Sequence, residues 1–100
     1  MILKMTFIAV IISFMTTVTY ADGHKNVELL AASCAACHGT NGHSIGGTPS
    51  LAGSDKLHFI KQMDQFVNGS RESTVMLHHA SGYTADEIEL LAEFFSKQNK

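Results

Sequence analysis

The amino-acid sequence predicts a small all-α domain, in which about three main helices and their connecting loops form one unit. Three segments carry apolar residues at helical spacing, whereas no segment alternates with the period of two that a strand requires. A length of 100 residues is enough for one domain. The formal net charge of -2 at pH 7 argues against nucleic acid as a partner, because such a surface would need to be basic.

The N-terminal segment Met1–Ala21 has the layout of a secretory signal peptide. Lys4 precedes an apolar run from Met5 to Met15, and the segment ends in Thr-Tyr-Ala, with small residues where a signal peptidase needs them. The apolar run is shorter than the ~20 residues that span a bilayer, which favours cleavage over a retained membrane anchor. The sequence therefore predicts a periplasmic domain of residues 22–100 with no membrane span after cleavage.

A domain of about 79 residues is small for a self-sufficient hydrophobic core. It has no Trp, and its two cysteines, Cys34 and Cys37, lie too close together for a disulfide to constrain the chain usefully. Something other than side chains is therefore expected to fill the interior.

The first helix is predicted over Val27–Cys37, with Asn26 as its N-cap, because Ala, Leu and Glu dominate the segment. Gly39–Gly53 follows as a long loop, since it holds five of the glycines and Pro49, the only proline. Loops of this length in small domains tend to be functional or to wrap around something.

The second helix is predicted from about Asp55 to Val67, with Gly69 as a stop signal just beyond it. Four apolar residues of this segment are expected on one helical face: Phe59, Met63, Phe66 and Val67.

The segment Ser70–Tyr83 is expected to be irregular. Thr84 and Glu87 have the spacing of a capping box and open the last predicted helix. Its expected buried stripe consists of Ile88, Leu91, Ala92 and Phe95.

The chemistry is carried by the pentapeptide Cys34-Ala35-Ala36-Cys37-His38, because C-x-x-C-H is the attachment signature of haem c. Two thiols at this spacing can add to the two vinyl groups of a haem, and the imidazole of His38 then lies beneath the iron. One covalently bound haem would also supply the apolar body that the small core lacks. We therefore expect Cys34, Cys37 and His38 to hold a single haem c.

Two other uses of a C-x-x-C pair fit the sequence less well. A thioredoxin-like redox pair follows a strand, whereas a helix is predicted here. A zinc site needs a second pair of ligands at matching spacing, and His43 and His58 do not form one.

The opposite axial position of the iron has six candidate ligands: Met63, Met76, His43, His58, His78 and His79. Met63 lies on the apolar face of the middle helix, which favours a core role. Met76 is preferred, because it lies 38 residues after His38 in a stretch that could fold over the haem. His78 and His79 could compete, although exposed positions are expected for both. A Met ligand raises the reduction potential and leaves no vacant position, which disfavours a gas-binding or peroxidatic role.

The order of motifs along the chain resembles a class I cytochrome c. The motifs are CAACHGTNG at 34–42, PSLAG at 49–53, Met76, YTADEI at 83–88 and LAEFF at 91–95. The resemblance implies crossed N- and C-terminal helices and a haem in a cleft with one exposed edge. It also implies that Met76 is a ligand and that the carbonyl group of Pro49 accepts a hydrogen bond from His38 Nδ1–H, which fixes the ring.

The segments STVM at 73–76 and GYT at 82–84 are similar to the cytochrome subunit of flavocytochrome c sulfide dehydrogenase. That resemblance implies a partner that contains FAD, oxidises sulfide and passes electrons singly to the haem. His78 and His79 depart from the pattern, and free monohaem c553-type or c4-type carriers share nearly all the motifs. The expected function is electron transport without catalysis, either as this subunit or as a carrier between respiratory or photosynthetic partners.

Overall fold

The computed structural model describes residues 26–100, and the predicted signal peptide Met1–Ala21 lies outside them. The elements are α1 (Val27–His38), η1 (Thr40–Gly42), α2 (Lys56–Asn68), α3 (Met76–Ala80) and α4 (Ala85–Ser96). Residues 26–100 contain no strand, so the predicted all-α class with three main helices is confirmed. Over the same range, no helix has the length and apolar character needed to cross a membrane.

The capping residues predicted from the sequence lie at the ends of the main helices. The Asn26 side chain accepts hydrogen bonds from two amides in the first turn of α1, at 3.1 and 3.4 Å. Gly69 ends α2 in the left-handed region with φ 78°. Thr84 and Glu87 form the reciprocal capping box of α4, with hydrogen bonds of 3.0 and 3.2 Å. Helices α1 and α2 agree with their predicted ranges to within one residue, and α4 begins at the predicted capping box.

The hydrophobic core lies where α4 packs against both α1 and α2. The rings of Phe59 and Phe95 stack there with centroids 5.8 Å apart, and Leu91 is completely buried. The whole predicted stripe of α4 is buried, and so is Met63, which confirms its core role. The core cluster consists of Ala31, Phe59, Met63, Ala80, Ile88, Leu91, Ala92 and Phe95.

One residue of the predicted α2 face is exposed. Val67 is 45% exposed, whereas Phe66 packs partly buried against the core. At 100° per residue Val67 points about 80° away from Phe59, at the margin of the face, and it lies in the last turn. Val67 therefore lies on the predicted face but at its exposed edge.

The segment Ser70–Tyr83 is more regular than predicted, because it contains the five-residue helix α3. A helix this short is not stable alone. Here the hydroxyl of Ser73 accepts a hydrogen bond from Leu77 N at 3.1 Å, and Ala80 is fully buried against α2 and the core. Tertiary packing, rather than local propensity, forms this helix.

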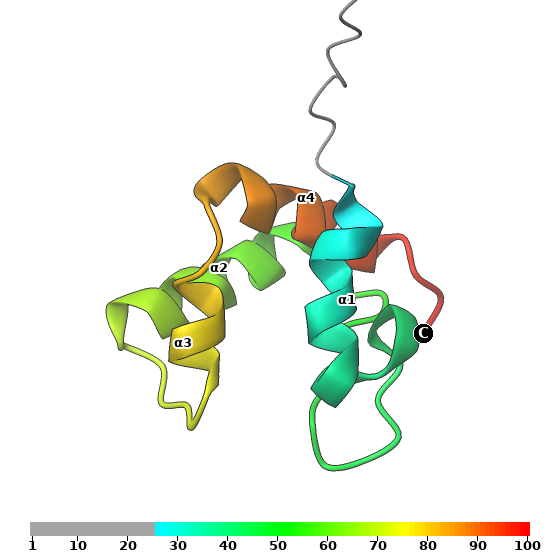
Figure 1. Ribbon diagram of the computed structural model, residues 1–100, viewed down its shortest axis with the longest axis horizontal. Helices are drawn as coiled ribbons and strands as arrows, with labels where there is room; N and C mark the ends of the chain where they lie inside the picture. Colours follow the sequence, from blue (N-terminus) through cyan, green and yellow to red (C-terminus); the bar gives the residue numbers. More distant parts are fainter. Residues whose placement is uncertain (1–25) are drawn as a thin grey trace, which may run out of the picture.

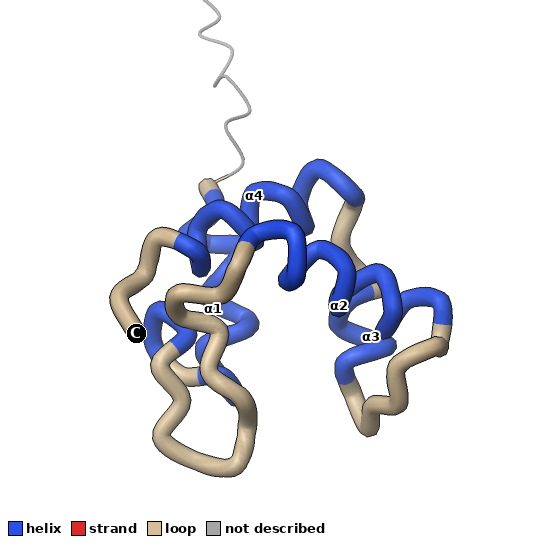
Figure 2. The backbone as a smooth tube through the Cα atoms, turned by 180° about the vertical axis from the view of Figure 1, so that it is seen from behind, coloured by secondary structure: helices blue, strands red, loops and turns tan. Residues whose placement is uncertain are grey.

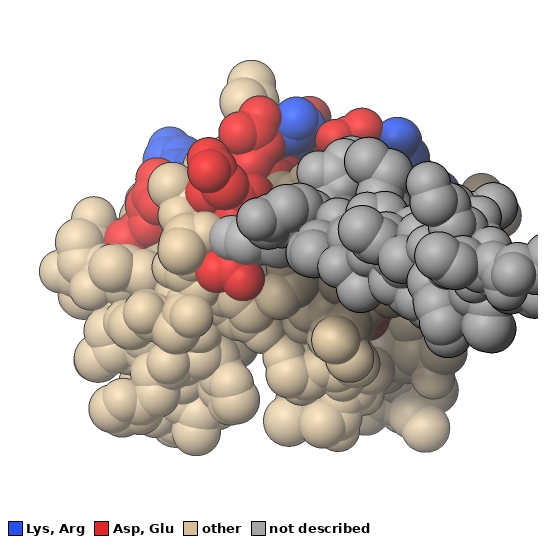
Figure 3. Space-filling model, turned by 45° about the horizontal axis from the view of Figure 1, so that its top comes forward, with Lys and Arg blue, Asp and Glu red and all other residues tan. Residues whose placement is uncertain are grey.

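The elements are arranged as an arch (Figure 1), with α2 and α4 across its top and α1 and α3 descending on either side. The view from behind in Figure 2 gives the same arrangement and places the loops at 43–50 and 69–75 at the two lower ends. In the space-filling view of Figure 3 the lower margin is notched between two lobes. The core occupies the top of the arch, and the notch separates the C-terminal end of α1 from α3.

Candidate haem site

The last two turns of α1 carry the three residues of the attachment motif. Residues separated by three and four positions lie on the same face of a helix, so Cys34, Cys37 and His38 project to one side of α1. Cys34 is partly buried against the core, whereas Cys37 is exposed, and both thiols are free. The two thiols and the imidazole are therefore available together at the notch end of the helix.

The ring of His38 is oriented by the loop that follows. Its Nδ1–H donates a hydrogen bond to the carbonyl oxygen of Pro49, at 2.6 Å. Because a carbonyl group can only accept, the proton must lie on Nδ1, and the lone pair of the neutral ring is then on Nε2. This is the tautomer that a metal-binding histidine needs, with the second nitrogen held by a backbone oxygen.

Two glycines allow the loop to bring Pro49 to His38. Gly39 and Gly42 have φ angles of 84° and 80°, in the region that side chains disfavour. A Cβ atom on Gly42 would lie 2.9 Å from the ring of Phe95, and the Gly42 carbonyl accepts a hydrogen bond from Leu51 N at 2.8 Å. The loop is therefore fixed against α4 at its base, which positions the carbonyl that holds His38.

The residues around the notch fit a covalently bound haem. The donor set is two free thiols and an imidazole whose Nδ1–H is held by a carbonyl oxygen. The described chain completely buries only two large side chains, Phe95 and Leu91, which is little for an independent domain. Val75 and Leu77 are 50% and 39% exposed on the segment across the notch. An apolar planar group in the notch would complete this thin core.

Burial raises the pKa of the Cys34 thiol, and hydrogen bonds from Ser33 and Tyr83 oppose this shift only in part. Burial also raises the pKa of the Tyr83 phenol. The phenol oxygen lies 2.5 Å from Ser33 Oγ and 3.4 Å from the Leu30 carbonyl oxygen. Tyr83 therefore connects the segment before α4 to the face of α1 that carries the thiols. The sequence did not predict this contact, because Tyr83 lies about 50 residues from Ser33 and Leu30.

The six candidates for the opposite axial position lie in different surroundings. Met76 is the first residue of α3 and is partly buried, on the side of the arch opposite α1 (Figures 1 and 2). His78 and His79 are exposed on the same helix, and His58 is exposed on α2. Met63 is in the core. Among residues 26–100, no group of three or more His, Cys, Asp or Glu side chains could hold a metal ion.

Both ring nitrogens of His43 lie against backbone carbonyl oxygens. Nδ1 lies 3.2 Å from the Thr40 carbonyl oxygen, and Nε2 lies within hydrogen-bond distance of the Asn99 carbonyl oxygen. His43 thus connects the loop to the C-terminal tail.

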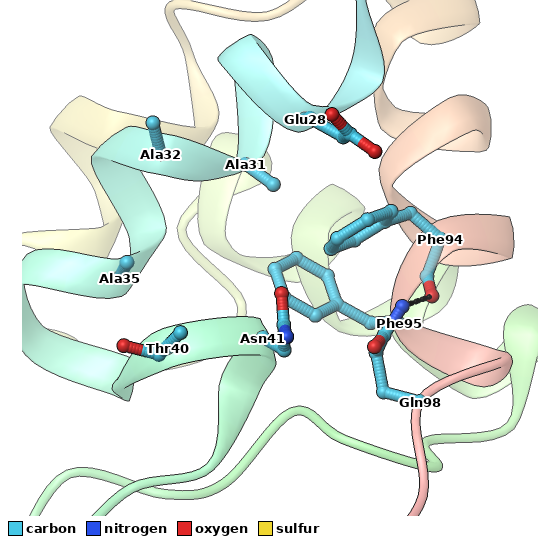
Figure 4. Close-up of a pocket in the computed structure, with 9 residues that line it drawn as sticks. All are labelled: Glu28, Ala31, Ala32, Ala35, Thr40, Asn41, Phe94, Phe95 and Gln98. Carbon is cyan, nitrogen blue, oxygen red and sulfur yellow. Dashed lines mark hydrogen bonds between the residues drawn. The ribbon is translucent and has the colours of Figure 1, made fainter.

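A pocket of about 440 Å³ lies between α1, η1 and the end of α4 (Figure 4). Its α1 residues point about 120° around the helix from Cys34, Cys37 and His38. The lining holds no thiol or imidazole, so the pocket is separate from the haem site. It is formed by Glu28, Ala31, Ala32, Ala35, Thr40, Asn41, Phe94, Phe95 and Gln98.

Comparison with protein families gives a match to the cytochrome c model over residues 25–98. The chain belongs to the cytochrome c family. It is therefore a monohaem electron-transfer protein that carries one haem c, covalently bound through the motif at Cys34 and Cys37. This confirms the predicted class, cofactor and non-catalytic role.

Three relatives show where the chain lies in this family. It is 48% identical over 73 residues to the cytochrome subunit of sulfide dehydrogenase from Chlorobaculum tepidum, which covers 73% of the chain and 66% of that protein. It is 38% identical over 69 residues to the thiosulfate dehydrogenase electron acceptor of Thiomonas intermedia, and the match covers 67% of the chain and 32% of that protein. It is 32% identical over 86 residues to cytochrome c4 of Pseudomonas aeruginosa, and the match covers 84% of the chain and 43% of that protein. The chain thus spans just under two thirds of the first relative and less than half of the other two.

Proposed function

We propose that His38 and Met76 are the axial ligands of the haem iron and that the chain is the cytochrome subunit of a flavin-dependent sulfide dehydrogenase. The single observation that carries the haem site is the hydrogen bond from His38 Nδ1–H to the Pro49 carbonyl oxygen, which leaves Nε2 free for the iron. The proposal for the partner is supported by the 48% identity to a cytochrome subunit of sulfide dehydrogenase.

The haem, when bound, supplies the one-electron chemistry. Cys34 and Cys37 prevent its dissociation, and the Pro49 carbonyl group orients and polarises the ring of His38. Met76, at the start of a helix that is packed against α2 through Ala80, offers a thioether from the other side of the arch. With two protein ligands, the site has no vacant position for oxygen or peroxide, so it exchanges electrons only.

The ligand is tested by replacing Met76 and, as a matched control, Met63. Met76→Ala should abolish the charge-transfer band from methionine sulfur to ferric iron and lower the reduction potential. Met63→Ala should keep the band but reduce stability, because Met63 is buried in the core. A band that survives in Met76→Ala would exclude Met76 as the ligand.

The partner is tested by isolating the protein with what accompanies it. A flavoprotein that co-purifies and reduces the haem when sulfide is added supports the subunit. The second candidate is a free carrier, which the similarity to a thiosulfate dehydrogenase electron acceptor and to cytochrome c4 favours. A lone red protein that sulfide and a flavoprotein do not reduce would support the carrier and exclude the subunit.

We also propose that Met1–Ala21 is removed during export and that the domain at residues 22–100 works in the periplasm. N-terminal sequencing of the periplasmic protein should begin at Asp22. A mature protein that begins at Met1 and sediments with membranes would contradict this proposal.

A further inference from the structure

The pocket between α1, η1 and the end of α4 has an apolar interior that the described side chains leave open. Its volume of about 440 Å³ is large enough for one long side chain or a small ligand. Three alanines of α1 form one wall: Ala31, Ala32 and Ala35. The other wall is formed by Phe94 and Phe95, whose rings pack edge to face with centroids 5.1 Å apart. The small methyl groups of the alanines leave a trough beside the ring of Phe94 (Figure 4).

Hydrogen-bond acceptors border this trough. Figure 4 shows the carboxylate of Glu28 above the ring of Phe94 and the side chain of Gln98 below it. Gln98 Nε2 donates a hydrogen bond to the Phe94 carbonyl oxygen at 3.0 Å, so the amide oxygen of Gln98 remains available as an acceptor. Asn41 adds a second amide to the lining, which can accept or donate.

The carboxylate of Glu28 has no cation beside it in the part of the chain that the structure describes. Ion pairs within residues 26–100 join Lys56 to Glu89 and Lys97 to Glu93. None of the described residues that line the pocket is a Lys, Arg or His. The pocket therefore combines an unpaired negative charge with an aromatic wall and an apolar trough.

This combination selects a cation carried on an apolar stem. A guanidinium group is planar, so it can stack on the ring of Phe94 while its N–H groups pair with the carboxylate of Glu28. An ammonium group is more strongly hydrated and lacks the flat face. The alkyl stem of an arginine would cover the methyl groups of the three alanines.

The energetics of binding favour a protein side chain over a free small cation as the source of this group. A free alkylguanidinium has few atoms, and the entropy of association leaves it a Kd on the order of 1 mM. The same group on a protein adds to the other contacts of an interface, and Arg is enriched among the residues that anchor interfaces in pockets. The pocket faces about 120° around α1 from the attachment motif, so such an anchor does not compete with the haem for space.

We propose that this pocket binds a guanidinium group on an apolar stem, and that an arginine side chain of the partner subunit supplies it. The guanidinium group pairs with Glu28 and stacks on Phe94, and the stem lies along the alanines of α1. The identity of the partner rests on the proposed function, whereas the guanidinium site does not.

The first test titrates the reduced, ¹⁵N-labelled holoprotein with butylguanidinium and with butylurea, its uncharged isostere, at low ionic strength. We expect butylguanidinium to shift the side-chain amide signals of Asn41 and Gln98 saturably. Butylurea should bind about tenfold more weakly, because it has no charge to place against Glu28 and Phe94. Equal binding of the two compounds, or no shift at the pocket, would overturn the proposal.

Variants of the lining locate the bound group. Glu28→Gln should weaken the binding of butylguanidinium about threefold, whereas Glu72→Gln, at an exposed carboxylate outside the pocket, should leave it unchanged. Ala32→Leu should abolish binding, because the larger side chain fills the trough, and the exposed position of Ala32 tolerates it. Ala85→Leu is the matched control, since Ala85 is exposed at the other end of α4. Binding that survives in Ala32→Leu would contradict the site.

The second test uses the complex with the flavoprotein. Ala32→Leu should weaken the association of the two proteins about tenfold, while the absorption spectrum and reduction potential of the haem match the parent. Unchanged association would refute the arginine anchor. If no flavoprotein accompanies the protein, the proposed function and the anchor fail together, whereas the titration with butylguanidinium still decides the guanidinium site.

Discussion

Where α4 crosses α1 and α2, the chain buries its own side chains, whereas around the attachment motif it buries almost none. The upper part has stacked aromatic rings, a fully buried Leu91 and capped helices. The lower part consists of a glycine-rich loop, the five-residue helix α3 and exposed apolar residues. The difference indicates that the upper part is specified by the sequence itself, and that the lower part depends on the haem.

The largest expected effect comes from removing the haem. A Cys34→Ala, Cys37→Ala double variant, prepared without haem, should lose helix content and cooperative unfolding, because no apolar group remains between the two sides of the arch. Circular dichroism during denaturant titration measures both quantities. Cooperative unfolding close to that of the holoprotein would mean that the lower part is stable without haem, which would contradict its dependence on the haem.

The next largest effect is expected in the upper core. Leu91→Ala should lower the free energy of unfolding of the holoprotein by about 3 kcal/mol, because Leu91 is completely buried. The neighbouring Leu90 is 36% exposed, so Leu90→Ala should cost about 1 kcal/mol or less. Similar losses in the two variants would show that this part is not packed as described.

The sequence predicted the upper part better because its signals are local. Adjacent residues are enough to predict the N-cap at Asn26 and the capping box at Thr84. The helical period is enough to predict the buried stripe of α4. The attachment motif is local too, since its five residues are contiguous. These features needed no knowledge of the tertiary arrangement.

What the sequence did not predict depends on distant residues. Helix α3 forms because Ala80 is buried against other elements, and Val67 is exposed because the covered face of α2 ends before it. Ser33 and Tyr83 are 50 residues apart, and His43 and Asn99 are 56 apart. No local pattern indicates such contacts.

A smaller effect is expected where the two parts meet. Tyr83→Phe removes the hydrogen bond between the phenol and Ser33 Oγ and the one that the phenol donates to the Leu30 carbonyl oxygen, and should cost about 1 kcal/mol. Ser33→Ala serves as its partner in a double-mutant cycle, measured by denaturant titration. Fully additive losses would mean that the two hydroxyl groups do not interact.

The smallest effect is expected on the exposed side of α4. The hydrogen bond and charge of Lys97 lower the pKa of Glu93. At pH values above the ordinary pKa of glutamate this pair therefore stabilises the fold. The stabilisation is lost as the pH falls through the lowered pKa of Glu93. Lys97→Gln should return the pKa of Glu93 toward its ordinary value, with almost no change in stability, because the pair is exposed. Carboxyl NMR titration measures the shift, and an unchanged pKa would contradict the pairing.

The central claim is that one haem, covalently bound through Cys34 and Cys37, completes the lower part of the domain. Intact-mass measurement after acid-acetone extraction tests this most directly. We expect the mass of the polypeptide plus one haem, with no titratable thiol and the red colour retained on the protein. A colourless polypeptide with two free thiols would contradict the claim.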